Sequence, residues 1–292
     1  MANFQHILFP IDFSPQSSAA IPYVAAFSRQ FEAKVTLLTV VPPIWVGSGS
    51  KLEHGADLED STHLESSAIE DRTRQRLDQT LTAEVHGLTM ERAVRSGDPV
   101  EQIIRFAREN AVDLIMMPTH GVGVFRSLLI GSVTAKILHD AECPVWTAAH
   151  AEEQHARHLP ESILCVVDGT ANSVEQMRWA VEFSGRFDAT LQLLHVVPPI
   201  LDWNAFADHS KLQEEEREKA HAQIEVLRSE AGVEAPLIIG VGPIAETVAE
   251  CASDEKADLL IIGRGQIGEK LGRLRTHAYD IVQRSPCPVI SV

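Results

Sequence analysis

The chain has few basic residues and no long apolar run. Of its 292 residues, 25 are Lys or Arg and 41 are Asp or Glu, so its formal net charge is −16. Such a chain repels nucleic acid and anionic membrane surfaces outside any local basic patch, and we expect neither as a partner. No stretch approaches the roughly 20 apolar residues that cross a bilayer, and the first residues do not resemble a secretory signal. The sequence therefore predicts a cytoplasmic protein.

Cysteines and catalytic motifs are also scarce. The 4 cysteines lie in or beside apolar runs and never at the two-residue spacing of a zinc-binding pair, so we expect reduced thiols in the core. The sequence contains no GxxxxGK[ST] loop, no acidic cluster placed to hold magnesium, and no nucleophile beside a base and an orienting acid. These absences argue against an enzyme.

What the chain does contain is one pattern that occurs twice. Two pairs of segments are offset by 156 residues and a third by 144, so the second copy is twelve residues shorter: 7–12 with 163–168, 37–44 with 193–200, and 141–145 with 285–289. A repeat of this length predicts two domains, and we place them at residues 1–150 and 160–292.

In each copy, short apolar runs rich in Val, Ile and Leu alternate with segments of helical period. The predicted strands are residues 6–12, 34–41, 90–97, 113–119 and 144–149, then 162–168, 190–197, 236–241, 258–263 and 288–292. Strands that are apolar at consecutive positions are covered on both faces. The sequence therefore predicts an α/β fold of two tandem doubly wound domains, each a five-stranded parallel sheet in the order 3-2-1-4-5 with helices on both faces.

In that order a ligand crevice forms between the first and fourth strands of a domain. In the first copy, Asp12 and residues 118–121 follow these two strands. Gly121 permits a tight turn with backbone N–H groups close to an anion, and nine residues later Gly131-Ser132 precedes a helical run. A helix N-terminus favours phosphate, so this stretch predicts a phosphate-binding loop that needs no lysine.

This arrangement resembles the universal stress protein family, whose nucleotide-binding members carry Gly, two residues, Gly, nine residues and Gly-Ser. Further similar segments are residues 7–14 (ILFPIDFS), 39–41 (TVV) and 143–145 (CPV). The resemblance covers both halves, so the chain is identified as a tandem member. It implies an ATP-binding regulatory or stress-response module that binds ATP with Mg²⁺ or Mn²⁺ and hydrolyses it slowly at most.

The resemblance also implies roles for residues of the first half. Asp12 would contact ribose or adenine, Val40 would present backbone to the adenine edge, and Gly97 would line the nucleoside end. The phosphates would lie against Thr119, His120, Gly121, Gly131, Ser132, Val133 and Thr134. Pro118 departs from the motif, because Pro stands where the first Gly belongs and supplies no N–H. Two alternatives stay open: Asp12 could simply cap the next helix, and His120 could have no role in binding.

The phosphate loop is eroded in the second half. Asp168 and Val196 are retained, and Gly263 and Gly265 begin the counterpart loop, but Arg275-Thr276 replaces the pair Gly131-Ser132. The GxGxxG match that starts at Gly263 follows a fourth strand rather than a first, so we interpret it as accidental. Arginines 264, 273 and 275 could bind an anion at a second site or reach toward the other half.

A second functional class remains possible, in which the paired domains form a structural or protein-interaction scaffold without nucleotide. The final strand of each half leaves a sheet edge that needs covering. In the dimers of the resembled family these strands pair, so we expect the two domains of one chain to pair with each other and the chain to form a homodimer. A loop and then an amphipathic helix are predicted between residues 51 and 82.

Overall fold

The computed structural model describes residues 3–42, 58–79, 87–119, 130–148, 158–200, 209–264 and 273–292. The first half contains β1 (His6–Pro10), α1 (Pro15–Phe31), β2 (Lys34–Val41), α2 (Leu58–Gln79), β3 (Met90–Ser96), α3 (Pro99–Glu109), β4 (Leu114–Pro118), α4 (Ser132–Asp140) and β5 (Val145–Ala148). The second contains β6 (Ser162–Val166), α5 (Asn172–Gly185), β7 (Thr190–Val197), α6 (His209–Ala231), β8 (Leu237–Val241), α7 (Ile244–Asp254), β9 (Leu259–Ile262), α8 (Arg273–Arg284) and β10 (Val289–Ser291).

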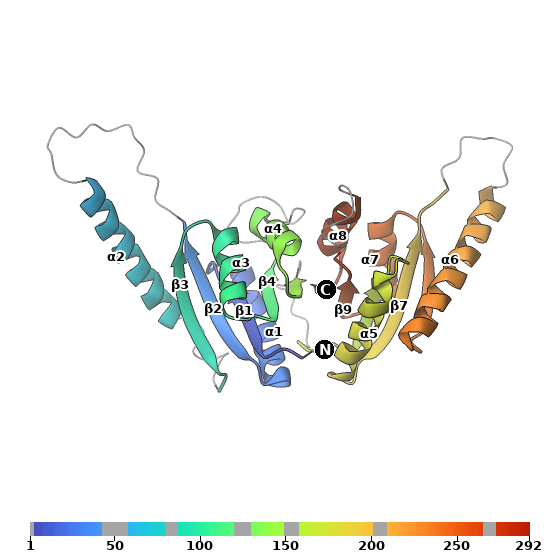
Figure 1. The fold of residues 1–292 in the computed structure, drawn as a ribbon, viewed down its shortest axis with the longest axis horizontal. Helices are drawn as coiled ribbons and strands as arrows, with labels where there is room; N and C mark the ends of the chain where they lie inside the picture. Colours follow the sequence, from blue (N-terminus) through green and yellow to red (C-terminus); the bar gives the residue numbers. More distant parts are fainter. Residues whose placement is uncertain are drawn as a thin grey trace.

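The ten strands form one sheet in the order β3-β2-β1-β4-β5-β10-β9-β6-β7-β8. Within each half every pair is parallel and the order is third, second, first, fourth, fifth, which confirms the predicted fold class. The two halves meet where β5 and β10 pair antiparallel, with Trp146 opposite Ile290. Figure 1 shows the halves side by side, with both chain termini at the junction and α2 and α6 at the outer flanks.

Each face of the sheet carries its own helix layer. Along β1, Ile7 and Phe9 point to one face and Leu8 to the other, and all three are fully buried, as expected of a strand covered on both sides. Helices α1, α2, α5 and α6 contribute to the core on the first face, and α3, α4, α7 and α8 to the core on the second. The crevice between β1 and β4 therefore opens where the layers diverge.

Local sequence sets where the helices begin. The side chain of Ser14 accepts from Ser17 N at 3.1 Å and caps α1, and Asp98 caps α3 with Pro99 at its first helical position. Pro22 lies in the interior of α1 rather than in its first turn, so α1 accepts the loss of one backbone hydrogen bond there.

One carboxylate in each half fixes the first strand to the fourth. Asp113 accepts from the N–H groups of Gln5 and His6 at 2.9 and 3.1 Å, and Asp258 accepts from those of Glu161 and Ser162 at the same two distances. The repeat thus preserves hydrogen bonds as well as apolar runs.

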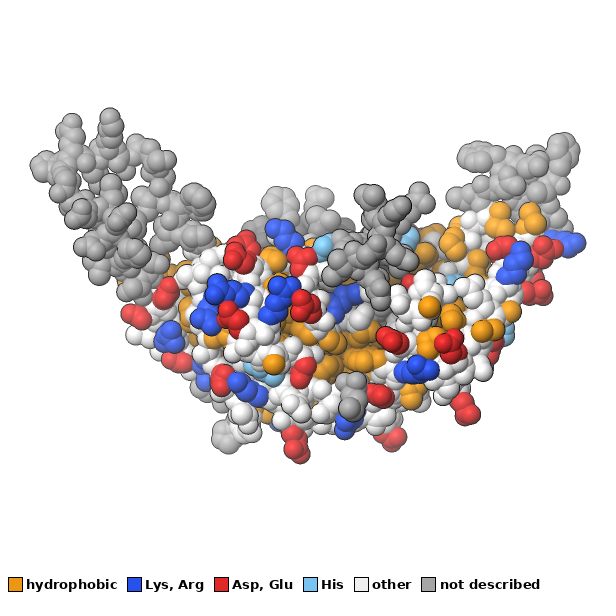
Figure 2. All heavy atoms as spheres, viewed as in Figure 1, with side chains coloured by type: hydrophobic (Ala, Val, Ile, Leu, Met, Phe, Trp, Pro, Cys, Tyr) orange, Lys and Arg blue, Asp and Glu red, His pale blue; other side chains and the backbone are white. Residues whose placement is uncertain are grey.

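Aromatic residues make up 5% of the chain, and many of them gather at the junction between the halves. Phe27 and Phe31 of α1 contact Phe183 of α5 with ring centroids 6.3 and 6.4 Å apart, and Phe4 lies 6.2 Å from the same ring. Such contacts stabilise an interface beyond the area that they bury. On the face shown in Figure 2, hydrophobic side chains gather at this junction, whereas acidic and basic side chains are interspersed over both halves.

The strand registers refine the alignment of the two copies. Leu8 pairs with Ile115 in the first half and Leu164 with Leu260 in the second, so β4 matches β9 at an offset of 145, found by subtracting 115 from 260. The offset of 144 applies only from α4 and α8 onward, after the loops that follow β4 and β9. Pro118 therefore corresponds to Gly263, and Thr119 corresponds to Arg264.

Candidate functional site

A cavity of about 870 Å³ lies at the carboxyl ends of the central strands of the first half. It is lined by the ends of β1, β2 and β4, by the start of α4 and by one face of α2. Its lining includes Asp12, Val40, Gly131, Ser132, Val133 and Thr134, six of the residues that the sequence predicts for nucleotide binding. The cavity falls in the size range of sites for small molecules and cofactors.

Asp12 lies at the end of β1 and is exposed to the cavity. Its Oδ1 accepts from Ser14 N at 3.0 Å and from Ser17 Oγ at 2.6 Å. Ser14 rather than Asp12 is the N-cap of α1, so the Asp12 carboxylate holds the cap residue in place without capping the helix itself. The same hydrogen bonds hold the carboxylate in a fixed place on the cavity wall.

The end of β2 forms the next part of the wall. Thr39 Oγ1 donates to Ile11 O at 3.2 Å, which ties this strand end to the residue before Asp12. Val40 and Val41 follow and line the cavity with partly buried side chains. This part of the site is apolar, which suits a flat heterocycle.

The N-terminus of α4 opens into the cavity without a side-chain cap. Gly131 is the N-cap residue, with φ −59° and ψ 144°, and it makes no side-chain hydrogen bond, unlike the caps of α1 and α3. In the first turn of any α-helix the N–H groups lack intrahelical acceptors, and here they belong to Ser132, Val133 and Thr134. Together with the helix dipole, these donors favour an anion at this end of the cavity.

Three of the predicted residues lie elsewhere or are already engaged. Thr119 is buried, does not line the cavity, and donates through both N and Oγ1 to Ala148 O at 3.2 Å. Thr134 lines the cavity, but its hydroxyl donates to Pro118 O at 3.1 Å, so only its N–H faces the ligand end. Gly97 adopts φ +139° beneath Gln102 and is not among the lining residues. His120 and Gly121 lie outside the described residues.

Helix α2 supplies a wall that sequence reasoning missed. Ile69, Arg72, Thr73 and Arg76 line the cavity, and the guanidinium carbon of Arg76 lies 4.2 Å from the centroid of the Phe13 ring. The only signal in the sequence was their helical spacing at positions i, i+3, i+4 and i+7, within a segment predicted to be an amphipathic helix. Nothing in that spacing shows which strand ends the helix would cover.

The corresponding crevice in the second half is filled. Gln176 occupies the position of Ala20 at the offset of 156, and its Nε2 donates to Val166 O at 2.9 Å. A Cβ atom added at Gly263 would lie 2.9 Å from Gln176 Oε1, so this amide lies between the carboxyl ends of β6 and β9. The Asp168 carboxylate accepts from Thr170 and Ser173, and Val196 is buried.

The helix start of the second half is also displaced. Counted by the offset of 144, Thr276 corresponds to Ser132, the first residue of α4, yet α8 already begins at Arg273. Arg275 and Thr276 therefore lie within the first turn of α8 instead of at its cap. Gly265 lies outside the described residues.

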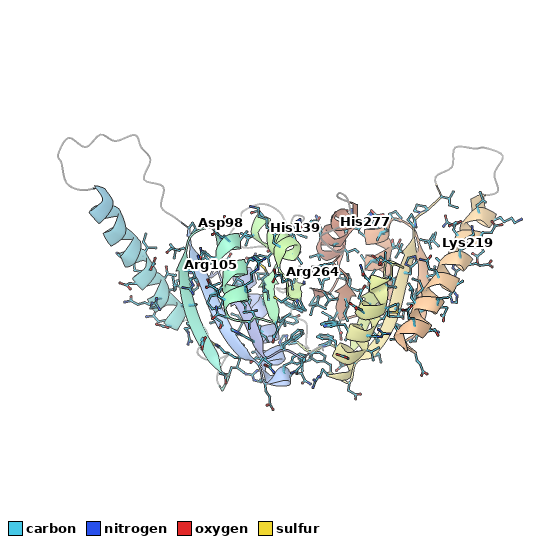
Figure 3. All side chains as sticks on the ribbon, in the orientation of Figure 1. Asp98, Arg105, His139, Lys219, Arg264 and His277 are labelled. Atoms are coloured by element: carbon cyan, nitrogen blue, oxygen red, sulfur yellow. The ribbon has the colours of Figure 1, made fainter. Side chains whose placement is uncertain are left out.

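Arg264 reaches into the other half, the second of the two roles that its sequence position allowed. Its Nη1 donates to Ala141 O at 2.7 Å and its Nη2 to Cys143 O at 2.5 Å, directly after α4. Burial lowers the pKa of this guanidinium below its ordinary value. Tyr279 of α8 adds a hydrogen bond to Ala135 O at 2.8 Å. Figure 3 shows Arg264 at the junction, between His139 of α4 and His277 of α8.

Neither a metal cluster nor a membrane-spanning helix is found within the part of the chain that the structure describes. No three His, Cys, Asp or Glu side chains of those residues are grouped to hold a metal ion. No helix there has both the length and the apolar character to cross a membrane.

The cysteines are free thiols, and burial raises the pKa of Cys165 and Cys287 to about 12.

The fold and site define a class of protein: a pair of doubly wound α/β domains joined at their edge strands, with a helix start that lacks a side-chain cap at the crevice of one domain. The chain belongs to the universal stress protein family, whose model matches residues 3–148 and again 160–292. It is thus a tandem, two-domain member.

Individual relatives agree with this assignment. A universal stress protein of Mycolicibacterium smegmatis is 26% identical over 200 residues, which span 66% of this chain and 66% of the relative. The universal stress protein MJ0577 of Methanocaldococcus jannaschii is 27% identical over 150 residues, 49% of this chain and 93% of its own length. A universal stress protein structure from Archaeoglobus fulgidus covers 100% of this chain and 97% of its own, with a TM-score of 0.62 and 21% identity, and supports the fold.

Proposed function

We propose that this protein is an ATP-binding universal stress protein, in which occupancy of the first-half cavity sets the shape of the chain or its choice of partner. The observation that carries the proposal is the uncapped start of α4, which opens into a cavity with an apolar wall at the end of β2 and a fixed carboxylate. Phosphates would lie against the N–H groups of Ser132, Val133 and Thr134. The Asp12 carboxylate would accept from ribose hydroxyls, and the base would lie against Val40.

The proposed role is binding rather than catalysis. Among the described lining residues Asp12 is the one carboxylate, and its Oδ1 already accepts two hydrogen bonds. A bound Mg²⁺ or Mn²⁺ would neutralise phosphate charge and add Lewis acidity, but the chain places no second acid or base beside Asp12 in the described wall. We therefore expect ATP to be held and hydrolysed slowly at most. Cytoplasmic location and homodimer formation stay predictions.

The second half acts in this proposal as the structural partner of the first. Gln176 fills its crevice, and Arg264 and Tyr279 bind carbonyl groups of α4 and of the residues that follow it. These contacts connect the second half to the helix whose start would hold the phosphates. The scaffold alternative thus applies to the second half and not to the whole chain.

Gly131→Asp tests the proposal without damaging the fold. The backbone of Gly131 is extended with negative φ, a conformation that any residue adopts, and Asp is a favourable N-cap. The new carboxylate would cap α4 and repel phosphate. At a hundredfold excess over its dissociation constant, ATP stabilises the wild type by about 2.7 kcal/mol, a rise of roughly 5 °C or more in Tm.

The variant should keep its Tm without ligand and lose this rise. Gly185→Asp is the matched control, because Gly185 is exposed at the end of α5 and nothing lies within 4 Å of its added Cβ. Its response to ATP should equal that of the wild type. Absence of any ATP-dependent rise in the wild type would favour the scaffold alternative for the whole chain.

A further inference from the structure

Helix α2 presents two cations to the cavity. Ile69, Arg72, Thr73 and Arg76, here named the α2 face, line it together with Asp12 and the start of α4. Arg74 and Gln75 lie between them and are not lining residues. In a chain with a formal charge of −16, two arginines on one wall of one cavity are a local exception to the acidic surface.

Helix α6 is the counterpart of α2 in the second half and provides a comparison for the α2 face. Leu77 of α2 and Ile224 of α6 are both fully buried on the same sheet face, so the two helices align at these residues. Arg72 then corresponds to Lys219, which forms an ion pair with Glu216 at 2.7 Å. Within the described part of the chain Arg72 has no carboxylate partner and no hydrogen bond.

Arg76 and its counterpart in α6 also differ in their contacts. Arg76 corresponds to Gln223, whose Nε2 donates to Gly169 O at 2.7 Å and so closes α6 onto the end of β6. In the first half Phe13 replaces Gly169, and the Arg76 guanidinium lies over its ring. The first half therefore keeps open, and lines with cations, a place that the second half closes with an amide.

The α2 face and the start of α4 belong to helix layers on opposite faces of the sheet. Leu77 packs in the core shared with α1, whereas Ile137 of α4 packs in the core on the other face. Asp12, the proposed ribose contact, follows β1 at the strand end and would accept a hydrogen bond from the ribose hydroxyl that carries no phosphate. A ligand that lies across this strand end with its 5′-phosphate at α4 would direct the hydroxyl side of its ribose toward the α2 face.

We propose that the cavity prefers adenine nucleotides that carry a second phosphate on the 2′ or 3′ position of the ribose, bound by Arg72 and Arg76. This inference rests on the proposed nucleotide site and adds a ligand class to it. The planar guanidinium group matches the geometry of a phosphate. The hydrogen bonds between the two are charge-assisted and stronger than those between neutral groups.

The test compares AMP, ADP and two adenosine bisphosphates that are isomers of ADP. ADP and adenosine 3′,5′-bisphosphate contain the same atoms, but ADP has both phosphates on the α4 side and the bisphosphate has one on each side. Isothermal titration should give the wild type about tenfold tighter binding of the 3′,5′- or the 2′,5′-bisphosphate than of AMP, the factor expected of one added charge-assisted contact. Arg72→Gln and Arg76→Gln should remove most of this gain and change AMP binding by less than about threefold.

Arg74→Gln is the control, since Arg74 is likewise exposed on the same helix but is not among the residues that line the cavity. It should change neither affinity. The inference is overturned if both bisphosphates bind the wild type no better than AMP, or if Arg74→Gln causes the same loss as Arg72→Gln. Binding of AMP and ADP without any preference for the bisphosphates would leave the proposed function standing. Absence of binding by all four nucleotides and by ATP would refute both.

Discussion

Replacing Arg264 with Met removes the donors that tie the second half to the end of α4 and keeps most of the apolar stem. The Ala141 and Cys143 carbonyl groups, now at 2.7 and 2.5 Å from the guanidinium, would lose charge-assisted hydrogen bonds in a partly buried place. Each such bond is worth about 1.5 to 3 kcal/mol. The wild type must also desolvate the guanidinium, which has no carboxylate partner among the described residues. We therefore expect a net loss of about 2 to 3 kcal/mol.

Urea unfolding followed by circular dichroism measures this loss, and the Tm should fall by roughly 5 to 10 °C. Arg178→Met is the matched control. Arg178 likewise donates to two carbonyl groups, those of Ala231 and Glu230, but it is exposed and its acceptors lie within its own half. Water can replace those bonds, so the control should lose about 0.5 kcal/mol. The account of the junction is refuted if Arg264→Met is no less stable than Arg178→Met.

Two further predictions concern single side chains. The Tyr23 hydroxyl is buried without a hydrogen-bond partner in the described structure, and desolvation raises its pKa to about 12. Tyr23→Phe should therefore raise the Tm by a few degrees. Tyr279→Phe should lower the Tm, because Tyr279 donates a hydrogen bond to Ala135 O. The opposite order of Tm values in a melting experiment would contradict this reasoning. Desolvation also raises the pKa of the partly exposed Cys143 thiol to about 11, so the reactive thiolate forms only as the pH rises toward that value. Alkylation of Cys143 by iodoacetamide, followed by peptide mass spectrometry, should keep accelerating above about pH 9, where an ordinary cysteine levels off; a plateau there would show an unshifted thiol.

The sheet was predictable from the sequence because each strand is apolar at consecutive positions and the repeat doubles every signal. The order of the strands followed from right-handed crossovers. Residue type alone indicated Asp98 as the N-cap of α3 but left Ser14 and Ser18 as alternatives for α1, where the structure has Ser14. The asymmetry between the two crevices was also visible in part, since Gly131-Ser132 has no counterpart in the second half.

Other features depend on contacts between residues distant in the sequence. The deletion of one residue between β9 and α8 became visible only through the strand pairing, so Thr119 and Arg264 could not be matched beforehand. The exchange of Ala20 for Gln176 could be read at the offset of 156, but not that its amide would reach Gly263. The α2 face contacts strand ends far from it in sequence, and helical spacing does not encode which cavity a helix covers.

The most direct test of the central claim is the stoichiometry of ATP binding, measured by isothermal titration on the full chain. The filled crevice at Gln176 and the open one at Asp12 predict one nucleotide per chain, and Gly131→Asp should abolish that binding. Two nucleotides per chain, or one that persists in Gly131→Asp, would contradict the account.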